Sequence, residues 1–158
     1  MKIISSIVTY NPEILRLKQN IVAILSQVDE IVIIDNGSKN IQEIGKLLIQ
    51  FDNIKVIKNE QNLGIASALN EAARYAKEQG YEWILTLDQD SVAPANLVET
   101  YLPYTQDKAI GMLGCKIVDR NFGEINGQDK LTCGYEEVEG CITSASLLNI
   151  KAWAEVGG

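Results

Sequence analysis

Two kinds of apolar pattern alternate along the first ninety residues, and this alternation most constrains how the chain can fold. Four apolar runs have the length of strands: residues 3–10, 30–35, 53–58 and 82–88. Between them, apolar residues recur at helical spacing, most clearly from Ile14 to Val28. Residues 31–34 and 84–87 are apolar on both faces, which is typical of parallel strands covered by helices on each side. Three strand–helix units in succession predict an α/β fold, with a mostly parallel sheet in a three-layer α/β/α arrangement.

The helix boundaries can be estimated from local signals. The first helix is expected to begin at Asn11-Pro12-Glu13, with an N-cap residue, a proline at the first helical position and then an acid. A second helix is expected over residues 41–51. The third is expected over residues 65–79, with Gly80 as its C-cap.

The pattern changes after Pro94. A short helix over residues 95–104 and a buried strand over 110–115 are expected first. A polar hairpin or exposed loop should follow over residues 119–129. The last expected elements are a strand over 141–148 and a helix that begins at Lys151.

Composition narrows the functional classes. A chain of 158 residues is expected to form one domain, and its net charge of −7 argues against a nucleic-acid binder. With no histidine, the chain cannot hold a histidine-based triad or zinc site. The cysteines are Cys115, Cys133 and Cys141, and with no Cys-x-x-Cys pair we expect reduced thiols in a cytoplasmic protein. No apolar run approaches the roughly 20 residues that span a bilayer.

Polar segments follow the four expected strands. They are Thr9-Tyr10, Asp35-Asn36-Gly37-Ser38, residues 59–64 and Asp88-Gln89-Asp90. Ligands of α/β sheets bind beyond the carboxyl ends of the strands, so these segments should converge at one edge. Carboxylates at the end of a buried strand need a cation or a hydrogen-bonding ligand to offset desolvation. The spacing of Asp88 and Asp90 suits a hard divalent cation that also holds phosphate oxygens.

Each motif alone has a simpler interpretation. Asn36-Gly37 could be an ordinary turn, Gly64-Ile65-Ala66 could be tight packing at a loop-to-helix junction, and the two acids could lie in a surface loop. The chain has no Gly-x-Gly-x-x-Gly after its first strand and no Walker A loop. Dinucleotide binding of the Rossmann type and P-loop hydrolysis are therefore not expected.

In combination the motifs are more specific. Segments 8–12, 32–38, 59–70 and 87–91 occur in this order and together resemble the donor-binding half of family 2 inverting glycosyltransferases, which have the nucleotide-diphospho-sugar transferase (GT-A) fold. Asp-Gln-Asp-Ser and Gly-Ile-Ala-x-Ala-Leu-Asn look most like the rhamnosyltransferase branch. The resemblance extends to segments 142–146 and 153–158. It implies a single GT-A domain over residues 1–158, with 1–91 as the nucleotide-sugar donor-binding half and 92–158 as the start of an acceptor-side half.

The resemblance also implies roles for the matching residues. Thr9 and Asp35 would meet the pyrimidine ring, where Asp35 accepts its imide N–H, and Tyr10 would pack against the ring or ribose. Asp88 would bind the ribose hydroxyls or a water, with a second possible role as a metal ligand. Asp90 would coordinate Mg²⁺ or Mn²⁺ on the diphosphate, and the cation would neutralise charge on the leaving group. The other implied donor-binding residues are Asn11, Asn36, Asn62, Gly64, Ala66, Asn70 and Gln89.

The implied reaction moves a sugar such as rhamnose, with inversion, from a dTDP- or UDP-sugar to a saccharide acceptor. Inversion needs a base for the acceptor hydroxyl, and in this family that acid follows a Gly-Gly-Phe-Asp-Glu-like segment. Since the sequence stops at Gly157-Gly158, we expect a truncated domain whose base lies beyond Gly158. Glu136, Glu137 and Glu139 are expected to be solvated surface charges. A longer parent protein could associate with the inner face of the membrane.

Two other functions stay open. A nucleotidyltransferase of the same fold predicts a glycine-rich, arginine-bearing loop after the first strand, where this sequence has Thr9-Tyr10-Asn11-Pro12. A non-catalytic α/β module could use Asp35 and Asp88 as an acidic pocket. Such a module predicts metal binding that does not depend on a nucleotide.

Overall fold

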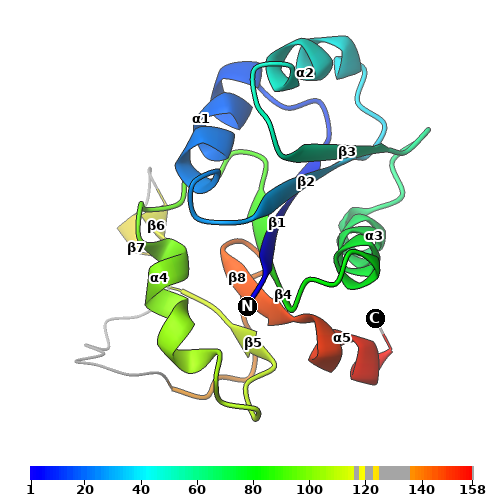
Figure 1. Cartoon of the computed structure of the whole chain (residues 1–158). Coiled ribbons are helices and arrows are strands. Elements are labelled where there is room, and N and C mark those ends of the chain that lie inside the picture. The colour runs from blue at the N-terminus through cyan, green and yellow to red at the C-terminus, as the bar shows by residue number, and fades with distance from the viewer. Residues whose placement is uncertain (116–117, 120–122, 125–135, 158) are drawn as a thin grey trace.

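The computed structural model describes residues 1–115, 118–119, 123–124 and 136–157. Its strands are β1 (Ile3–Thr9), β2 (Glu30–Asp35), β3 (Ile54–Lys58), β4 (Trp83–Asp88), β5 (Met112–Leu113), β6 (Val118–Asp119), β7 (Gly123–Glu124) and β8 (Ser146–Asn149). Its helices are α1 (Ile14–Ile24), α2 (Ile41–Leu48), α3 (Ile65–Glu78), α4 (Leu97–Tyr101), a 3₁₀ helix (Leu102–Tyr104) and α5 (Ile150–Val156). Figure 1 shows their arrangement. Cys133 lies outside the described residues, as does most of the expected hairpin, of which the short β6–β7 pair is described.

Six strands form one sheet in the order β3-β2-β1-β4-β8-β5. The pairs β1–β2, β1–β4 and β2–β3 are parallel, whereas β8 runs antiparallel to both β4 and β5. The first four strands are therefore the parallel core that the sequence predicts. The second half of the chain adds two antiparallel strands to the same sheet.

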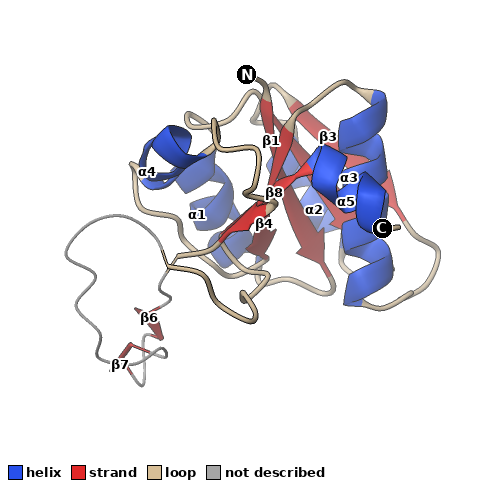
Figure 2. Ribbon diagram, turned by 90° about the horizontal axis from the view of Figure 1, so that it is seen from below, coloured by secondary structure: helices blue, strands red, loops and turns tan. Residues whose placement is uncertain are grey.

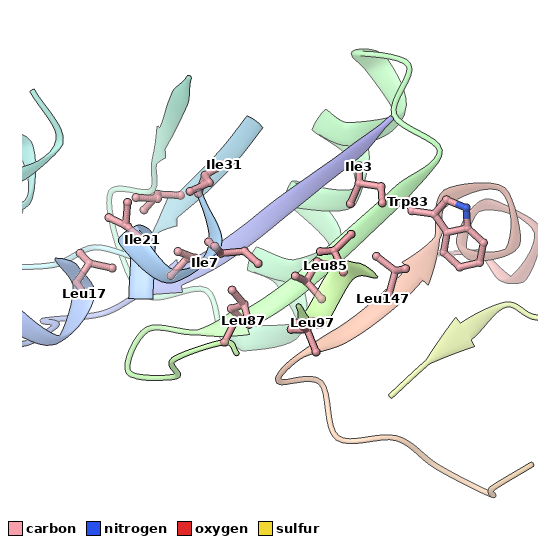
Figure 3. Packing of buried hydrophobic residues seen from close by; sticks show 14 of the residues in the cluster. Ile3, Ile7, Leu17, Ile21, Ile31, Trp83, Leu85, Leu87, Leu97 and Leu147 are labelled. Atoms are coloured by element: carbon pink, nitrogen blue, oxygen red, sulfur yellow. The ribbon is translucent and has the colours of Figure 1, made fainter. Parts of the chain in front are cut away.

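Helices cover both faces of the sheet, which confirms the expected three-layer arrangement (Figure 2). Helices α1, α2 and α4 pack on the face that carries Ile7, Ile31 and Leu85 (Figure 3). Helices α3 and α5 pack on the opposite face, against Val32 and Ile84. Successive residues of β2 thus point to opposite faces, and both sets are buried. This double burial explains why the strand reads as a continuous apolar run.

The side of α3 that faces the sheet consists of alanines: Ala68, Ala72, Ala73 and Ala76. They are at most 2% exposed. Their small side chains let the helix backbone approach the strands closely. The C-cap of α3 is Gln79 rather than Gly80. Gly80 comes directly after it and has a φ of 75°, the left-handed conformation that glycine commonly takes just past a helix end.

The start of α1 differs from the expectation. Helix α1 begins at Ile14, with Glu13 as its N-cap and no side-chain capping bond, so Asn11 is not the N-cap. Instead Asn11 has a φ of 49°, and its side chain and N–H bond to Lys39 and Ser38. Asn11 thus bonds to residues far along the sequence and does not cap the helix that follows it.

The later elements are shorter than expected. Helix α2 ends at Leu48 rather than residue 51, β5 spans Met112–Leu113 rather than 110–115, and α4 gives way to the 3₁₀ helix. Strand β8 begins at Ser146 rather than residue 141. Ala145, with a φ of 57°, turns the chain there while its N–H donates to the Thr86 carbonyl at 2.7 Å.

None of the described helices is long and apolar enough to cross a membrane.

Candidate functional site

The carboxyl ends of the parallel strands meet at one edge of the sheet, as the sequence predicts. Thr9 is paired with Asp35, and Asp35 with Lys58. On the other side of β1, Val8 is paired with Asp88. The strand register therefore places the polar segments that follow these strands along one edge.

Asp35 lies at the centre of this edge and is 2% exposed. Its Oδ1 accepts a hydrogen bond from the Thr9 hydroxyl at 3.0 Å, and its Oδ2 accepts one from the Ser38 N–H at 3.1 Å. A carboxylate has about four acceptor positions, so each oxygen has one left after its bond to a described residue. Thr9 is fully buried, and its hydroxyl orients the Asp35 carboxylate.

Asn36 connects the end of β2 to the loop that follows β3. Its Nδ2 donates to the Asn62 Oδ1 at 2.9 Å, and its Oδ1 accepts from the Leu63 N–H at 3.0 Å. The Asn62 Oδ1 also accepts from the Gly64 N–H at 2.9 Å. Two predicted donor-binding segments are thus held together by one buried amide.

Gly37 lets these two segments approach each other. It has a φ of 83°, and a Cβ at this position would lie 2.9 Å from both the backbone C and the Cα of Gln61. The Asn36-Gly37 turn is therefore also a point of close backbone contact, which a simple turn would not require.

The acidic loop, residues 88–91, follows β4 at the same edge. Asp88 and Asp90 are exposed, and within the described parts of the chain neither carboxylate has a hydrogen-bond or ion-pair partner. Gln89 is half-buried, and its Oε1 accepts from the Tyr10 N–H at 2.8 Å. Tyr10 leaves 47% of its surface exposed. The loop thus presents two exposed acids next to an accessible aromatic ring.

No group of three or more acidic or cysteine side chains that could hold a metal ion occurs among the described residues. A cation at the acidic loop would have at most Asp88 and Asp90 as carboxylate ligands among the described residues. Hard cations of this kind take six or more oxygen ligands, so phosphate oxygens and waters would have to complete the shell. The residues present fit a cation that is shared with a phosphorylated ligand.

Sequence reasoning missed residues that hold the acidic loop from α1 and from the segment before β8. Asn20 Nδ2 donates to the Asp88 carbonyl at 2.6 Å, and Arg16 Nε donates to the Asp90 carbonyl at 2.8 Å. The Ser144 hydroxyl lies 2.8 Å from that of Ser91. One signal for Asn20 was visible, because it is a polar residue on the apolar stripe of α1.

Asn70 and Ala66 lie on a side of α3 that faces α5. The Asn70 Oδ1 accepts a hydrogen bond from the Trp153 Nε1–H at 3.0 Å. Both residues line a cavity of about 320 Å³, with Thr86, Thr143 and Trp153 among its other walls. The structure connects Asn70 to α5, and its predicted contact with a nucleotide stays a prediction.

The remaining sequence expectations concern the acids and thiols of the second half. Glu136, Glu137 and Glu139 are exposed, as expected for solvated charges. Cys115 and Cys141 are free thiols and half-buried. Neither set takes part in the edge formed by the strand ends.

Comparisons with known proteins agree with this arrangement. The sequence matches the family described as Glycosyl transferase family 2 over residues 6–140. It is 30% identical over 115 residues to the dTDP-rhamnosyl transferase RfbF of Shigella flexneri, over 73% of this chain and 38% of that protein. The chain thus spans well under half the length of this relative.

Two solved structures share the fold. S. aureus TarS residues 1–349 in complex with UDP has a TM-score of 0.71 at 18% identity, over 99% of this chain and 49% of that one. GalNAc-T7 with UDP, GalNAc and Mn²⁺ has a TM-score of 0.68 at 16% identity, over 99% and 37% of the two chains. At these identities the likeness shows the GT-A fold.

Proposed function

Because this chain belongs to glycosyl transferase family 2, we propose that it binds a nucleoside-diphosphate sugar for transfer of the sugar to a saccharide acceptor, with inversion. The donor is a dTDP- or UDP-sugar, and rhamnose is the first sugar to test. The name of the Shigella relative and the UDP complex of TarS support this donor class.

The observation that carries the proposal is the pair of exposed carboxylates, Asp88 and Asp90, at the edge where Asp35 and Asn36 are also held. Neither carboxylate has a partner among the residues that the structure describes. A diphosphate is anionic, and the chain has a net charge of −7. A cation between Asp90 and the diphosphate would turn repulsion into attraction. We therefore assign Asp90, with Asp88, to Mg²⁺ or Mn²⁺, which supplies Lewis-acid stabilisation of the leaving diphosphate.

The pyrimidine is assigned to the Asp35 side of the site. Asp35 is oriented by Thr9 and Ser38 and has acceptor capacity left for the imide N–H. The exposed ring of Tyr10 can stack on the base or ribose. The acceptor hydroxyl needs a base for inversion, and no described residue is assigned to that role.

Calorimetric titration with UDP and with dTDP, in the presence and absence of Mn²⁺, tests the proposal. We expect binding that requires Mn²⁺ and that weakens about tenfold or more in Asp90→Asn, because a metal ligand is lost. Asp52→Asn is the matched control, since Asp52 is an exposed acid in the turn before β3, at the opposite edge of the sheet. It should bind like the unmodified protein.

Two outcomes would overturn the proposal. One is that neither nucleotide binds in the presence of Mn²⁺, and the other is that Asp90→Asn keeps full affinity. Titration with Mn²⁺ alone distinguishes the rival binding module. Tight binding of the metal without any nucleotide would favour that module instead.

A further inference from the structure

We propose that Arg16 and Asn20 of α1 are positioning residues that hold the acidic loop in the geometry that the cation and diphosphate need. This inference rests on the proposed function. Both side chains come from one helix and lie one turn apart on it, so they reach the loop together. Figure 1 shows α1 and the connection that follows β4.

The two bonds end on backbone carbonyls rather than on carboxylates. Asn20 Nδ2 lies 2.6 Å from the Asp88 carbonyl oxygen, and Arg16 Nε lies 2.8 Å from that of Asp90. Asp88 and Asp90 therefore each have their main chain held by α1, while their carboxylates have no partner within the described parts of the chain. An ion pair with Arg16 would instead have occupied the carboxylate that a cation requires.

The burial of Asn20 supports a role beyond packing. Asn20 is fully buried on the stripe that also carries Leu17 and Ile21, and among the described residues its Oδ1 has no hydrogen-bond partner. A buried amide with an unsatisfied oxygen is destabilising, and an apolar side chain of similar size would avoid that cost. The bond from Nδ2 to Asp88 is the contact that an apolar residue could not make.

The Arg16 guanidinium is itself oriented. Its Nη1 donates to the Gln19 Oε1 at 2.8 Å, while its Nε faces the loop. The loop is also fixed from its other sides by the bond from Tyr10 to Gln89 and by the Ser91–Ser144 contact. Residues 88–90 are thus ordered before any ligand arrives.

Arg16 and Asn20, together called the clamp, order the acidic loop before the ligand binds. A flexible loop would have to lose conformational entropy when the cation joins the two carboxylates to the diphosphate, which weakens binding. A loop that is already held avoids that loss. Removal of the clamp should therefore weaken the Mn²⁺-dependent binding of nucleotide more than it weakens the fold.

The test uses Arg16→Met, Arg16→Lys and the matched control Lys18→Met. Lys18 lies on the same helix and its Nζ contacts Gln50, so Lys18→Met removes an equal charge without touching the loop. Affinities for UDP and dTDP at saturating Mn²⁺, and for Mn²⁺ at saturating nucleotide, are measured by calorimetry. The electron paramagnetic resonance spectrum of bound Mn²⁺ reports its ligand geometry directly.

We expect Arg16→Met to weaken both affinities about tenfold, the equivalent of one hydrogen bond, and to change the Mn²⁺ spectrum. Arg16→Lys should recover part of the loss, because an ammonium can also donate to the Asp90 carbonyl. Lys18→Met should match the unmodified protein. Asn20→Leu should behave like Arg16→Met while its free energy of unfolding stays equal or rises.

Wild-type affinities and spectrum in Arg16→Met, or an equal loss in Lys18→Met, would overturn the inference. If Asn20→Leu does not fold, Arg16→Met and Arg16→Lys, compared with Lys18→Met, still test the inference. The proposed function fails in a different way, namely when the unmodified protein binds neither nucleotide with Mn²⁺.

Discussion

Replacement of Gly37 by alanine tests whether the close backbone contact at the sheet edge is needed for both stability and binding. The Cβ of the new residue would lie 2.9 Å from the backbone C and Cα of Gln61. Backbone atoms cannot rotate away as the end of a side chain can. The turn after β2 and the loop after β3 must therefore separate, and the Asn36–Asn62 hydrogen bond between them lies directly in the affected region.

The size of the effect follows from two contributions. Gly37 has a φ of 83°, and a non-glycine residue in this conformation costs about 1 kcal/mol. Overpacking against a rigid neighbour adds about 1–3 kcal/mol. The free energy of unfolding should therefore fall by about 2–4 kcal/mol in Gly37→Ala.

Gly80→Ala separates the two contributions. Gly80 has a φ of 75°, but a Cβ there would meet nothing within 4 Å, so only the conformational cost of about 1 kcal/mol should appear. Urea unfolding of both variants gives the free energies by linear extrapolation. Nucleotide affinity with Mn²⁺, measured on the folded variants, should drop in Gly37→Ala and stay unchanged in Gly80→Ala.

Equal destabilisation of the two variants would refute the reasoning, because the contact with Gln61 would then contribute nothing. Unchanged nucleotide affinity in a destabilised Gly37→Ala would refute its second part. In that case the spacing of the two segments would matter for folding and not for the ligand.

Three further predictions concern the fold. Burial and the hydrogen bond to Glu30 raise the pKa of Tyr75 to about 12. The protonated phenol therefore stabilises the protein below pH 10, and this contribution is lost as the pH rises from 10 to 12. Between pH 9 and pH 11, urea unfolding should show a smaller fall in the unfolding free energy of Tyr75→Phe than in that of the unmodified protein. Asn149 accepts two backbone N–H bonds at the start of α5, so Asn149→Ala should lower the unfolding free energy by about 1 kcal/mol, and an unchanged value would contradict the capping role. Ile7 is fully buried under α1, and Ile7→Ala should cost about 2–5 kcal/mol in the same assay, whereas a loss below 1 kcal/mol would show that the core repacks.

The parallel core was predictable because its signals are local. Strand β2 ends at Asp35 as expected, since burial on both faces leaves an unbroken apolar run followed by a polar turn. The same logic located Asp88, the last residue of β4, and Asp90, which follows that strand, at the same edge.

Contacts between distant segments could not be predicted from local patterns. Asn11 looks like a helix cap, but its partners Ser38 and Lys39 lie far along the sequence and draw it into a left-handed conformation. The antiparallel direction of β8 could not be predicted either, because an apolar run has the same sequence pattern in a parallel and in an antiparallel strand. Asn70 resembled a nucleotide contact, while its bond to Trp153 depends on a helix 83 residues away.

The place of β1 in the sheet has a consequence for synthesis of the chain. Strand β1 precedes β2 and β4 along the chain, yet it lies between them in the sheet, and Ile3 is paired with Trp83. One side of β1 therefore stays unpaired until the ribosome has released some eighty more residues, as the Ile3–Trp83 register requires. During that interval the nascent chain exposes an apolar strand edge, the form most prone to wrong pairing, and the slow step of folding should be the arrival of β4.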